Sequence, residues 1–244
     1  MDAIDEAPHP PGPGPHWEES WSFDFVAADG LLAGYARLAV RPADGRAWWW
    51  AAVVGQGRPY VLVREHDVDP PRPPGLEIRA PGLWAEAYCE QPFEHWSVGL
   101  EAFAVAFDDP QDAVGDERGL PLPLGFDLGW EPDAPEPEVD GPGSYGQACA
   151  VHGEVLVGRE RLAVDGTGRR AHRWGERDWW QGSGPGGPGE ALVRLDGRGM
   201  VEWPEPLYQA PVLVPGPGGR TARLARALCR APGGGLAWFE KLSG

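Results

Sequence analysis

Short apolar runs, each ended by Gly, Pro or Asp, recur along this chain. The first four occupy residues 21–26, 35–41, 47–54 and 60–64, and they contain β-branched or aromatic residues. The 36 glycines and 28 prolines among 244 residues interrupt the chain too often for long helices. Runs of this length with turn residues between them are typical of antiparallel strands. The sequence therefore predicts an all-β protein with little helix.

Alternation of large and small residues supports the same fold class. Residues 103–107 read Phe, Ala, Val, Ala and Phe. A large side chain therefore occurs at every second residue, and on a strand all of these side chains lie on one face. Such a face suits the inside of a barrel. Residues 221–230 are ambiguous, since Leu224 and Leu228 stand four apart in an alanine-rich stretch that favours helix. We predict a strand there.

Proline-rich stretches divide the chain. Residues 1–16 contain five prolines among glycines and acids, which predicts a disordered leader. Residues 131–144 contain four prolines, no aromatic residue and no alternation, which predicts a linker. The sequence thus predicts an N-terminal β domain at 17–130 and a C-terminal β domain at 145–244, each the size of one small barrel or of half a shared one.

The amino-acid composition excludes some classes of binding partner and some kinds of site. The net charge of −16, with only 21 Lys and Arg, argues against nucleic acid and anionic membranes. Three widely spaced cysteines, Cys89, Cys149 and Cys229, form no CxxC pair, so we expect reduced thiols rather than disulfides or a cysteine zinc site. An acidic N-terminus and the lack of a long apolar run predict a cytoplasmic protein without membrane insertion. The oligomeric state stays open.

The segment from Arg169 to Trp180 concentrates the most chemistry, with arginines, a histidine, two carboxylates and three tryptophans. We predict that residues 162–165 and a turn at 166–168 lead into it as a hairpin. On a strand, one face would carry His172, Trp174, Glu176 and Asp178, and the other Ala171, Arg173, Arg177 and Trp179.

Two interpretations of this segment compete. As a pocket wall, it offers proton transfer by His172, Glu176 or Asp178, and cation–π stabilisation by Trp174. Arg173 and Arg177 would then bind or orient the substrate. As a structural ion-pair lattice, the arginines would neutralise the two carboxylates beneath packed tryptophans.

Two further clusters are candidates. His95 and Glu101 would form an acid/base pair if a turn at Gly99 brought them together beside Trp96, although a histidine in a β protein is more often structural. Trp48 and Trp50 share one strand face and would either line an apolar cavity or pack a barrel.

Metal, nucleophile and cofactor motifs are lacking in the sequence. The six histidines show no HxH, HxxxH or HExxH spacing, so we predict no metal site. There is no GxSxG motif, no phosphate-binding glycine motif, and no cofactor is predicted.

The order of several motifs resembles a known family. Residues 145–147, 151–155 and 164–168 lead into His-Arg-Trp-Gly-Glu-Arg-Asp-Trp at 172–179. This order is similar to that of the lipocalin-like carotenoid hydratase (hydroxyneurosporene synthase) superfamily, in its actinobacterial branch, whose hallmark reads Arg-Asp-His-Ser-Trp-Gly followed by Arg-Asp-Trp. The further matches are Glu19 to Phe25, Arg58-Pro59, and Glu94 to Gly99 leading to Glu101, Ala102 and Phe103.

The resemblance implies two lipocalin-like antiparallel β-barrel or sandwich domains packed together, enclosing an apolar cavity. It implies a cofactor-independent cyclase or isomerase of secondary metabolism or antibiotic biosynthesis, acting on an apolar polyene, terpenoid or polyketide. The chemistry would be Diels–Alderase-like or initiated by protonation. One alternative is a hydratase that adds water to an isoprenoid double bond, and another is a carrier of an apolar small molecule.

One departure from the family pattern separates these alternatives. Ala171 stands where the hydratase hallmark has the aspartate suspected of donating a proton, and Arg173 stands at the hallmark serine. Either the acid role has moved, with Glu176, Asp178 and Glu101 as candidates, or no protonation occurs. A pericyclase would need only donors that polarise a carbonyl, a role that suits Arg173, Trp174 and His172.

Overall fold

The computed structural model describes residues 1–115, 118–179, 193–194, 205–216, 220–230 and 235–243. It is all-β and antiparallel, as predicted, with two short 3-10 helices, η1 (Ala3–Glu6) and η2 (Pro110–Val114). The larger sheet contains β1 (Trp17–Ala27), β2 (Leu32–Arg41), β3 (Arg46–Gly55), β4 (Tyr60–Val68), β5 (Glu77–Ala80), β6 (Leu83–Gln91), β7 (His95–Phe107), β8 (Leu120–Pro132), β9 (Glu138–Gly141), β10 (Ser144–Val157) and β11 (Glu160–Glu176). The smaller sheet contains β12 (Val193–Arg194), β13 (Pro206–Gln209), β14 (Val212–Pro215), β15 (Thr221–Arg230) and β16 (Leu236–Ser243).

The larger sheet closes into a barrel of eight long strands. β1 to β4 form one meander, and β7, β8, β10 and β11 form the other. The two meanders are joined where β11 pairs with β1 and where β4 pairs with β7. Eight antiparallel strands closed in this way form a lipocalin-like barrel, and closure removes the exposed edges of the sheet. β5 and β6 extend from β7 as a hairpin, and β9 adds to β10.

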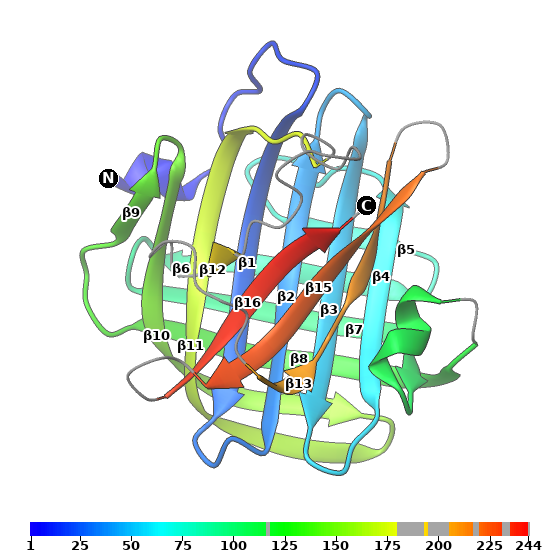
Figure 1. The fold of residues 1–244 in the computed structure, drawn as a ribbon. Helices are drawn as coiled ribbons and strands as arrows, with labels where there is room; N and C mark the ends of the chain where they lie inside the picture. Colours follow the sequence, from blue (N-terminus) through cyan, green and yellow to red (C-terminus); the bar gives the residue numbers. More distant parts are fainter. Residues whose placement is uncertain (116–117, 180–192, 195–204, 217–219, 231–234, 244) are drawn as a thin grey trace.

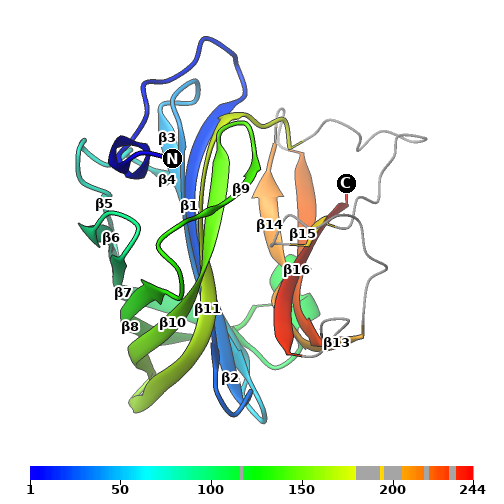
Figure 2. The ribbon, with the colours of Figure 1, turned by 90° about the vertical axis from the view of Figure 1, so that its left-hand side faces the viewer.

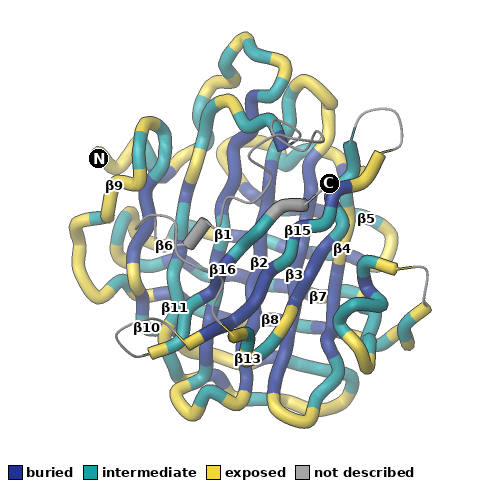
Figure 3. Tube along the Cα trace, viewed as in Figure 1, coloured by how far each residue is buried: buried dark blue, intermediate teal, exposed yellow. Residues whose placement is uncertain are grey.

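Packed side chains fill the barrel. Alternate residues of each strand point inward, and the largest of them are fully buried aromatics contributed by four strands: Trp21, Phe25, Trp49, Trp96 and Trp130. Alternation therefore places half of each strand in this interior and half on its outer face. Figure 3 shows how consistently the middle strands are buried.

The smaller sheet packs against the outer face of β1 to β4, so the two sheets form layers (Figures 1 and 2). The second core lies between them, with Tyr35, Trp48 and Trp50 on the barrel side and Leu228 and Trp238 on the other. Residues 221–230 form β15, as predicted. The helical spacing of its leucines reflects a strand that is buried along most of its length.

The division between the sheets does not coincide with the predicted linker. β10 pairs directly with β8 across residues 131–144, and β11 pairs with β1, so residues 145–176 belong to the barrel. The prolines at 131–144 lie in a connection between strands of one sheet. Such a connection favours proline and glycine just as a linker between domains does. The smaller sheet is formed from residues 193 onward.

Two predicted turns are wrong. Gly166 and Gly168 lie inside β11, and the hairpin turn stands instead between β10 and β11. A Cβ at Gly168 would lie 1.9 Å from the main-chain oxygen of Asp24, so this glycine permits a close approach of the paired strand rather than a reversal. Gly99 likewise lies inside β7, between β6 and β8.

The N-terminal segment, predicted as a disordered leader, packs on the barrel. η1 carries Glu6, which is 4% exposed, and the chain then passes over the ends of β1 and β11. Its prolines exclude regular pairing, but they do not exclude specific contacts by the acidic and histidine side chains between them. No helix among the described residues has the length and apolar character needed to cross a bilayer.

Candidate functional site

Strand β11 presents two different sets of side chains to two different places. His172 and Trp174 point to the barrel interior and its mouth, where both contact the N-terminal segment. Ala171 and Arg173 point outward, toward the smaller sheet. The predicted sharing of faces along this strand is confirmed, and its consequence is that residues 171–174 contribute to two sites.

The outward side chains line a pocket of about 290 Å³ between the barrel and the smaller sheet. The larger sheet contributes β1, β2, β9, β10 and β11, and the smaller sheet contributes β15 and β16. We call this the inter-sheet pocket. Its charged lining consists of five arginines and three carboxylates, namely Arg37, Arg169, Arg173, Arg177, Arg226, Asp24, Asp140 and Glu240. In a chain of net charge −16, this excess of cations is a local exception.

Asp24 is the titratable group with the most useful chemistry in the inter-sheet pocket. Its Oδ1 accepts a hydrogen bond from the main-chain N–H of Arg169 at 2.9 Å. Burial raises the pKa of Asp24 to about 6, although that hydrogen bond and the charges of Arg226 and Arg169 oppose the rise. A carboxyl with such a pKa both takes up and releases a proton near neutral pH.

The register of β1 and β11 places Asp24 near Ala171 on the outer face of the barrel. Ser22 pairs with Ala171, and Asp24 pairs with Arg169, two positions further along the same outer face. Asp24 and Arg169 also line a neighbouring pocket of about 320 Å³. The Asp24 carboxyl group therefore lies where the two pockets meet, close to Ala171.

Arg226, on β15, faces the inter-sheet pocket from the opposite sheet. Its side chain is 2% exposed, and its guanidinium carbon lies 3.8 Å from the ring centre of Tyr35. Nε forms an ion pair with Oε1 of Glu240 at 3.2 Å, and neither Nε nor Nη1 has a hydrogen-bond partner within the described part of the chain. A buried guanidinium N–H without an acceptor is costly, so an oxygen atom that reached Nη1 would relieve that cost.

A second carboxylate, Glu18, is fully buried and holds the arginines in place on the side away from the pocket. Its oxygens lie 2.6 Å from Nη2 of Arg37 and 3.1 Å from Nη1 of Arg41, and one accepts from the indole N–H of Trp179 at 2.8 Å. Burial would raise the pKa of Glu18, but Arg37, Arg177, the indole and Arg41 together hold it below the usual value. Glu18 is thus an ionised structural anchor. Arg177 therefore pairs with a carboxylate of β1, whereas the ion-pair lattice interpretation predicted Glu176 and Asp178 as the partners of the arginines.

At the barrel mouth, Glu6 of the N-terminal segment forms a buried ion pair with Arg170 of β11. The two guanidinium nitrogens of Arg170 lie 3.1 and 2.5 Å from the Glu6 oxygens. The indole N–H of Trp96 donates to Glu6 at 2.6 Å, and Arg170 also donates to Gln147. Trp96, predicted to bind substrate, therefore holds the N-terminal segment in place.

His172, predicted to be catalytic, is 1% exposed at the same mouth. Its Nε2 lies 2.9 Å from Oε1 of Glu19, and its Nδ1 lies 2.9 Å from the main-chain oxygen of Asp5. Burial lowers the pKa of His172 to about 4 and raises the pKa of Glu19. Trp174 stacks on His9 with ring centres 3.9 Å apart, so both predicted residues face the N-terminal segment rather than the inter-sheet pocket.

The other predicted acids lie elsewhere. Glu176 and Asp178 are placed near His16 at the end of β11, and Glu101 is exposed on the outside of β7. His95 and Glu101 share that outer face but are six residues apart on a continuous strand, roughly 20 Å, so they form no acid/base pair.

The two predicted tryptophans of β3 belong to the core between the sheets. Trp48 and Trp50 stack at 6.0 Å, and the Trp50 indole donates to His66 at 2.6 Å. Burial lowers the pKa of His66 to about 3, which keeps it neutral. Arg37 lies 5.0 Å from the ring of Trp50. The two rings thus support the arginine wall from behind.

Sequence reasoning missed Asp24 and Arg226. Neither stands in a motif, and Asp24 lies in an ordinary amphipathic strand. The available signal was the alternation of β1, whose outer face carries Glu18, Ser20, Ser22 and Asp24 where apolar residues would fit a core. This pattern indicates a site only once the pairing of β1 with β11 is known.

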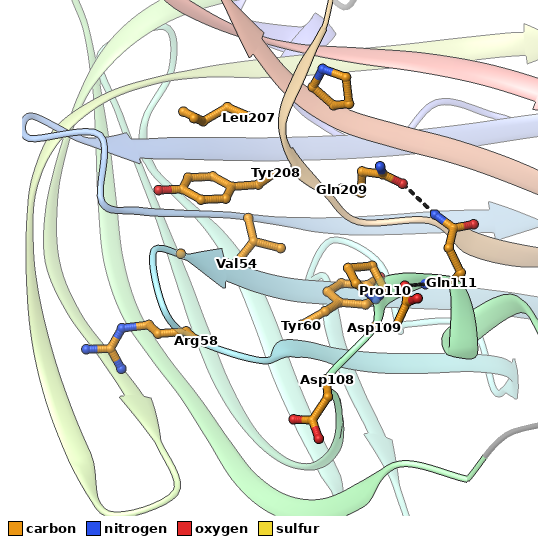
Figure 4. Close-up of a pocket in the computed structure, with 12 residues that line it drawn as sticks. Val54, Arg58, Tyr60, Asp108, Asp109, Pro110, Gln111, Leu207, Tyr208 and Gln209 are labelled. Carbon is orange, nitrogen blue, oxygen red and sulfur yellow. Dashed lines mark hydrogen bonds between the residues drawn. The ribbon is translucent and has the colours of Figure 1, made fainter.

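A further pocket, of about 430 Å³, lies between β3, β4, η2 and β13 (Figure 4). Gln111 donates to Gln209 across it. Arg58 is paired with Glu160 at 2.6 and 2.9 Å, and the Tyr60 hydroxyl donates to the main-chain oxygen of Pro211 at 2.8 Å. Because these polar groups already have partners, the inter-sheet pocket is the stronger candidate.

Several solved structures are similar to this chain at low sequence identity. A putative AttH from Nitrosomonas europaea has 12% identity and a TM-score of 0.46, covering 98% of this chain and 67% of that one. CghA has 12% identity and a TM-score of 0.39, with coverage of 94% and 58%. Kievitone hydratase from Nectria haematococca has 11% identity and a TM-score of 0.39, with coverage of 93% and 61%. The chain thus spans about three fifths to two thirds of the length of these structures.

No curated protein matches the chain. A family model covers residues 2–184, which include the N-terminal segment and the whole barrel. Because this match extends over more than half of the chain, the protein belongs to the family described as "Domain of unknown function (DUF7064)".

Proposed function

We propose that this protein is a non-redox isomerase or cyclase that acts on a carbonyl-containing carbon chain, such as a polyketide, in the inter-sheet pocket. Asp24 would be its acid/base group. The observation that carries this proposal is the position of Asp24, a carboxyl with its pKa raised to about 6, beside Ala171 in a pocket lined by arginines.

The charge of the pocket selects between the candidate reactions. A carbocation formed beside Arg173 and Arg226 would be repelled by both guanidinium groups, which disfavours cyclisation initiated by protonation of an alkene. An enolate carries the opposite charge, and fixed cations around it stabilise the transition state that leads to it. The arginines therefore favour chemistry at a carbon next to a carbonyl group.

Arg226 and Asp24 supply the two functions that such chemistry needs. The unpartnered Nη1 of Arg226 would donate to the carbonyl oxygen. The Asp24 carboxylate would take a proton from the adjacent carbon, and the C–H electron pair would move into the new C=C bond while negative charge moves to the oxygen. If a C=C bond adjoins that carbon, Asp24 would return the proton to the far end of the resulting dienolate, which completes an isomerisation. If the chain carries a second carbonyl group, the enolate carbon would instead attack its carbon, the C=O π electrons would move to the oxygen, and the alkoxide would take the proton from Asp24, which closes a ring.

Proton exchange tests this proposal without knowledge of the natural substrate. The probe is 5-oxodecanoic acid, which has an apolar chain, a ketone and a carboxylate. In heavy water near pH 7, we expect the protein to exchange the protons next to the ketone faster than buffer does, as measured by NMR. Asp24→Asn should lower the enzymatic rate by about 100-fold or more, since positioned acid/base groups contribute 10²–10⁴-fold.

Binding of the same probe separates catalysis from affinity. Arg226→Met should weaken binding, whereas Asp24→Asn should leave it nearly unchanged. As a control, Glu101→Gln alters an exposed carboxylate on β7 and should change neither. A protein that binds the ketone yet exchanges no proton above the buffer rate would contradict the proposal and favour a pericyclase or a carrier.

A further inference from the structure

Three side chains of metal-ligand type converge at the barrel mouth from distant parts of the sequence. They are His9 of the N-terminal segment, Glu19 of β1 and His172 of β11, and their ligand atoms all lie within 4.8 Å of one another. Nδ1 of His9 lies 2.8 Å from Oε1 of Glu19, and Nε2 of His172 lies 2.9 Å from the same oxygen. Glu19 and His172 are buried, and His9 is partly buried.

The hydrogen bonds of His172 direct a lone pair at Glu19. The main-chain oxygen of Asp5, 2.9 Å from Nδ1, can only accept, so Nδ1 carries the hydrogen. In a neutral imidazole, Nε2 is then an acceptor, and it faces a carboxylate oxygen, which is also an acceptor. Two acceptors at this separation require a proton or a metal cation between them.

The surroundings are those of metal-binding histidines, which usually engage their second ring nitrogen with a carboxylate or main-chain oxygen. Nδ1 of His172 has the Asp5 main-chain oxygen, and Nε2 of His9 lies 3.7 Å from the Asp5 carboxylate. Stacking fixes both rings, since His9 lies on Trp174 at 3.9 Å and His172 on Trp21 at 4.6 Å. The Asp5 main chain thus orients the His172 ring, and the Asp5 carboxylate lies near the second nitrogen of His9.

We propose that His9, Glu19 and His172 bind a divalent transition-metal ion, with Zn²⁺ as the first candidate. Two imidazole nitrogens and one carboxylate oxygen are a donor set that Zn²⁺ accepts, with the fourth position of a tetrahedral site open. Donors at roughly 2.0–2.1 Å from Zn²⁺ lie about 3.3 Å apart, so Oε1 of Glu19 has to move back by roughly half an ångström.

Such a site would join the N-terminal segment to the barrel. His9 is ten residues before Glu19 and 163 residues before His172 in the sequence. Because the three residues are so far apart, no spacing motif predicts this metal site. None of the three side chains lines the inter-sheet pocket, so this proposal is independent of the proposed function.

Metal titration of the full chain tests the site. After treatment with EDTA, calorimetry should show one equivalent of Zn²⁺ bound, and Co²⁺ should give visible absorption bands of a nitrogen and oxygen site. Glu19→Gln and His9→Ala should each lower the affinity for Zn²⁺ at least tenfold and remove the Co²⁺ bands. His9→Ala alters only the N-terminal segment, so circular dichroism should show the barrel intact.

Two histidines outside the proposed metal site provide matched controls. His16→Ala removes a partly exposed histidine of the same segment, and His152→Ala removes an exposed histidine of β10, so both should bind Zn²⁺ like the unaltered protein. The proposal is refuted by the absence of saturable binding, by unchanged affinity in Glu19→Gln and His9→Ala, or by a thiolate band with Co²⁺, which would place the ion on a cysteine.

Discussion

Replacement of Asp24 by Asn should stabilise the protein at neutral pH. Burial raises the pKa of Asp24 from 3.8 to about 6, against the hydrogen bond from Arg169 and the attraction of the arginines. The unfolded chain ionises this carboxyl at its ordinary pKa. The folded state therefore binds the proton more tightly, and above pH 6 it carries a charge that it accommodates less well than the unfolded chain does.

The size of the effect follows from the pKa difference. A rise of about two pKa units corresponds to about 3 kcal/mol as an upper bound. Because the Asp24 side chain is partly exposed, solvent screening reduces this, and we expect about 1–2 kcal/mol. This penalty is fully present above pH 6 and disappears as the pH falls toward 4, so the gain from Asp24→Asn should follow the same course.

Urea unfolding at pH 7.5 and at pH 4 measures this directly. Asp24→Asn should raise the free energy of unfolding at pH 7.5 and leave it nearly unchanged at pH 4. Asp165→Asn, in a side chain that is 88% exposed, is the control and should change little at either pH. A loss of stability in Asp24→Asn at pH 7.5 would refute the reasoning, because it would mean that the arginines stabilise the ionised carboxylate more than burial penalises it.

Three further substitutions test the packing. Glu6→Ala should lower the free energy of unfolding by about 3 kcal/mol, because it leaves the buried Arg170 guanidinium without its carboxylate; a change below 1 kcal/mol would mean that the N-terminal segment does not hold this place. Gly168→Ala should cost about 2 kcal/mol or more, because its Cβ would meet the main chain of β1 at 1.9 Å, whereas Gly75→Ala, with its nearest contact at 3.5 Å, should have little effect. Leu228→Ala should cost about 3 kcal/mol in the same urea assay, and a smaller loss would show that the core between the sheets is loosely packed.

The sequence predicted the local structure best where alternation is strong. The all-β class, the strand at residues 221–230 and the two faces of residues 171–179 could be derived from period-two patterns and turn residues. The turns predicted at Gly99 and at Gly166–Gly168 fail because glycine also occurs inside strands where two chains approach closely, and composition does not distinguish these uses. The expected linker fails for the same reason, since prolines also mark connections within a sheet.

The candidate sites depended on pairings that no local pattern contains. The sequence by itself determined that β11 offers two chemically different faces, because side chains on a strand must alternate. Only the tertiary structure decided what each face meets. Pairing with β1 placed Asp24 beside Ala171, packing of β15 brought the Arg226 guanidinium into the same pocket, and docking of the N-terminal segment set His9 against Glu19 and His172. Long-range packing sets these contacts, and it depends on the whole chain.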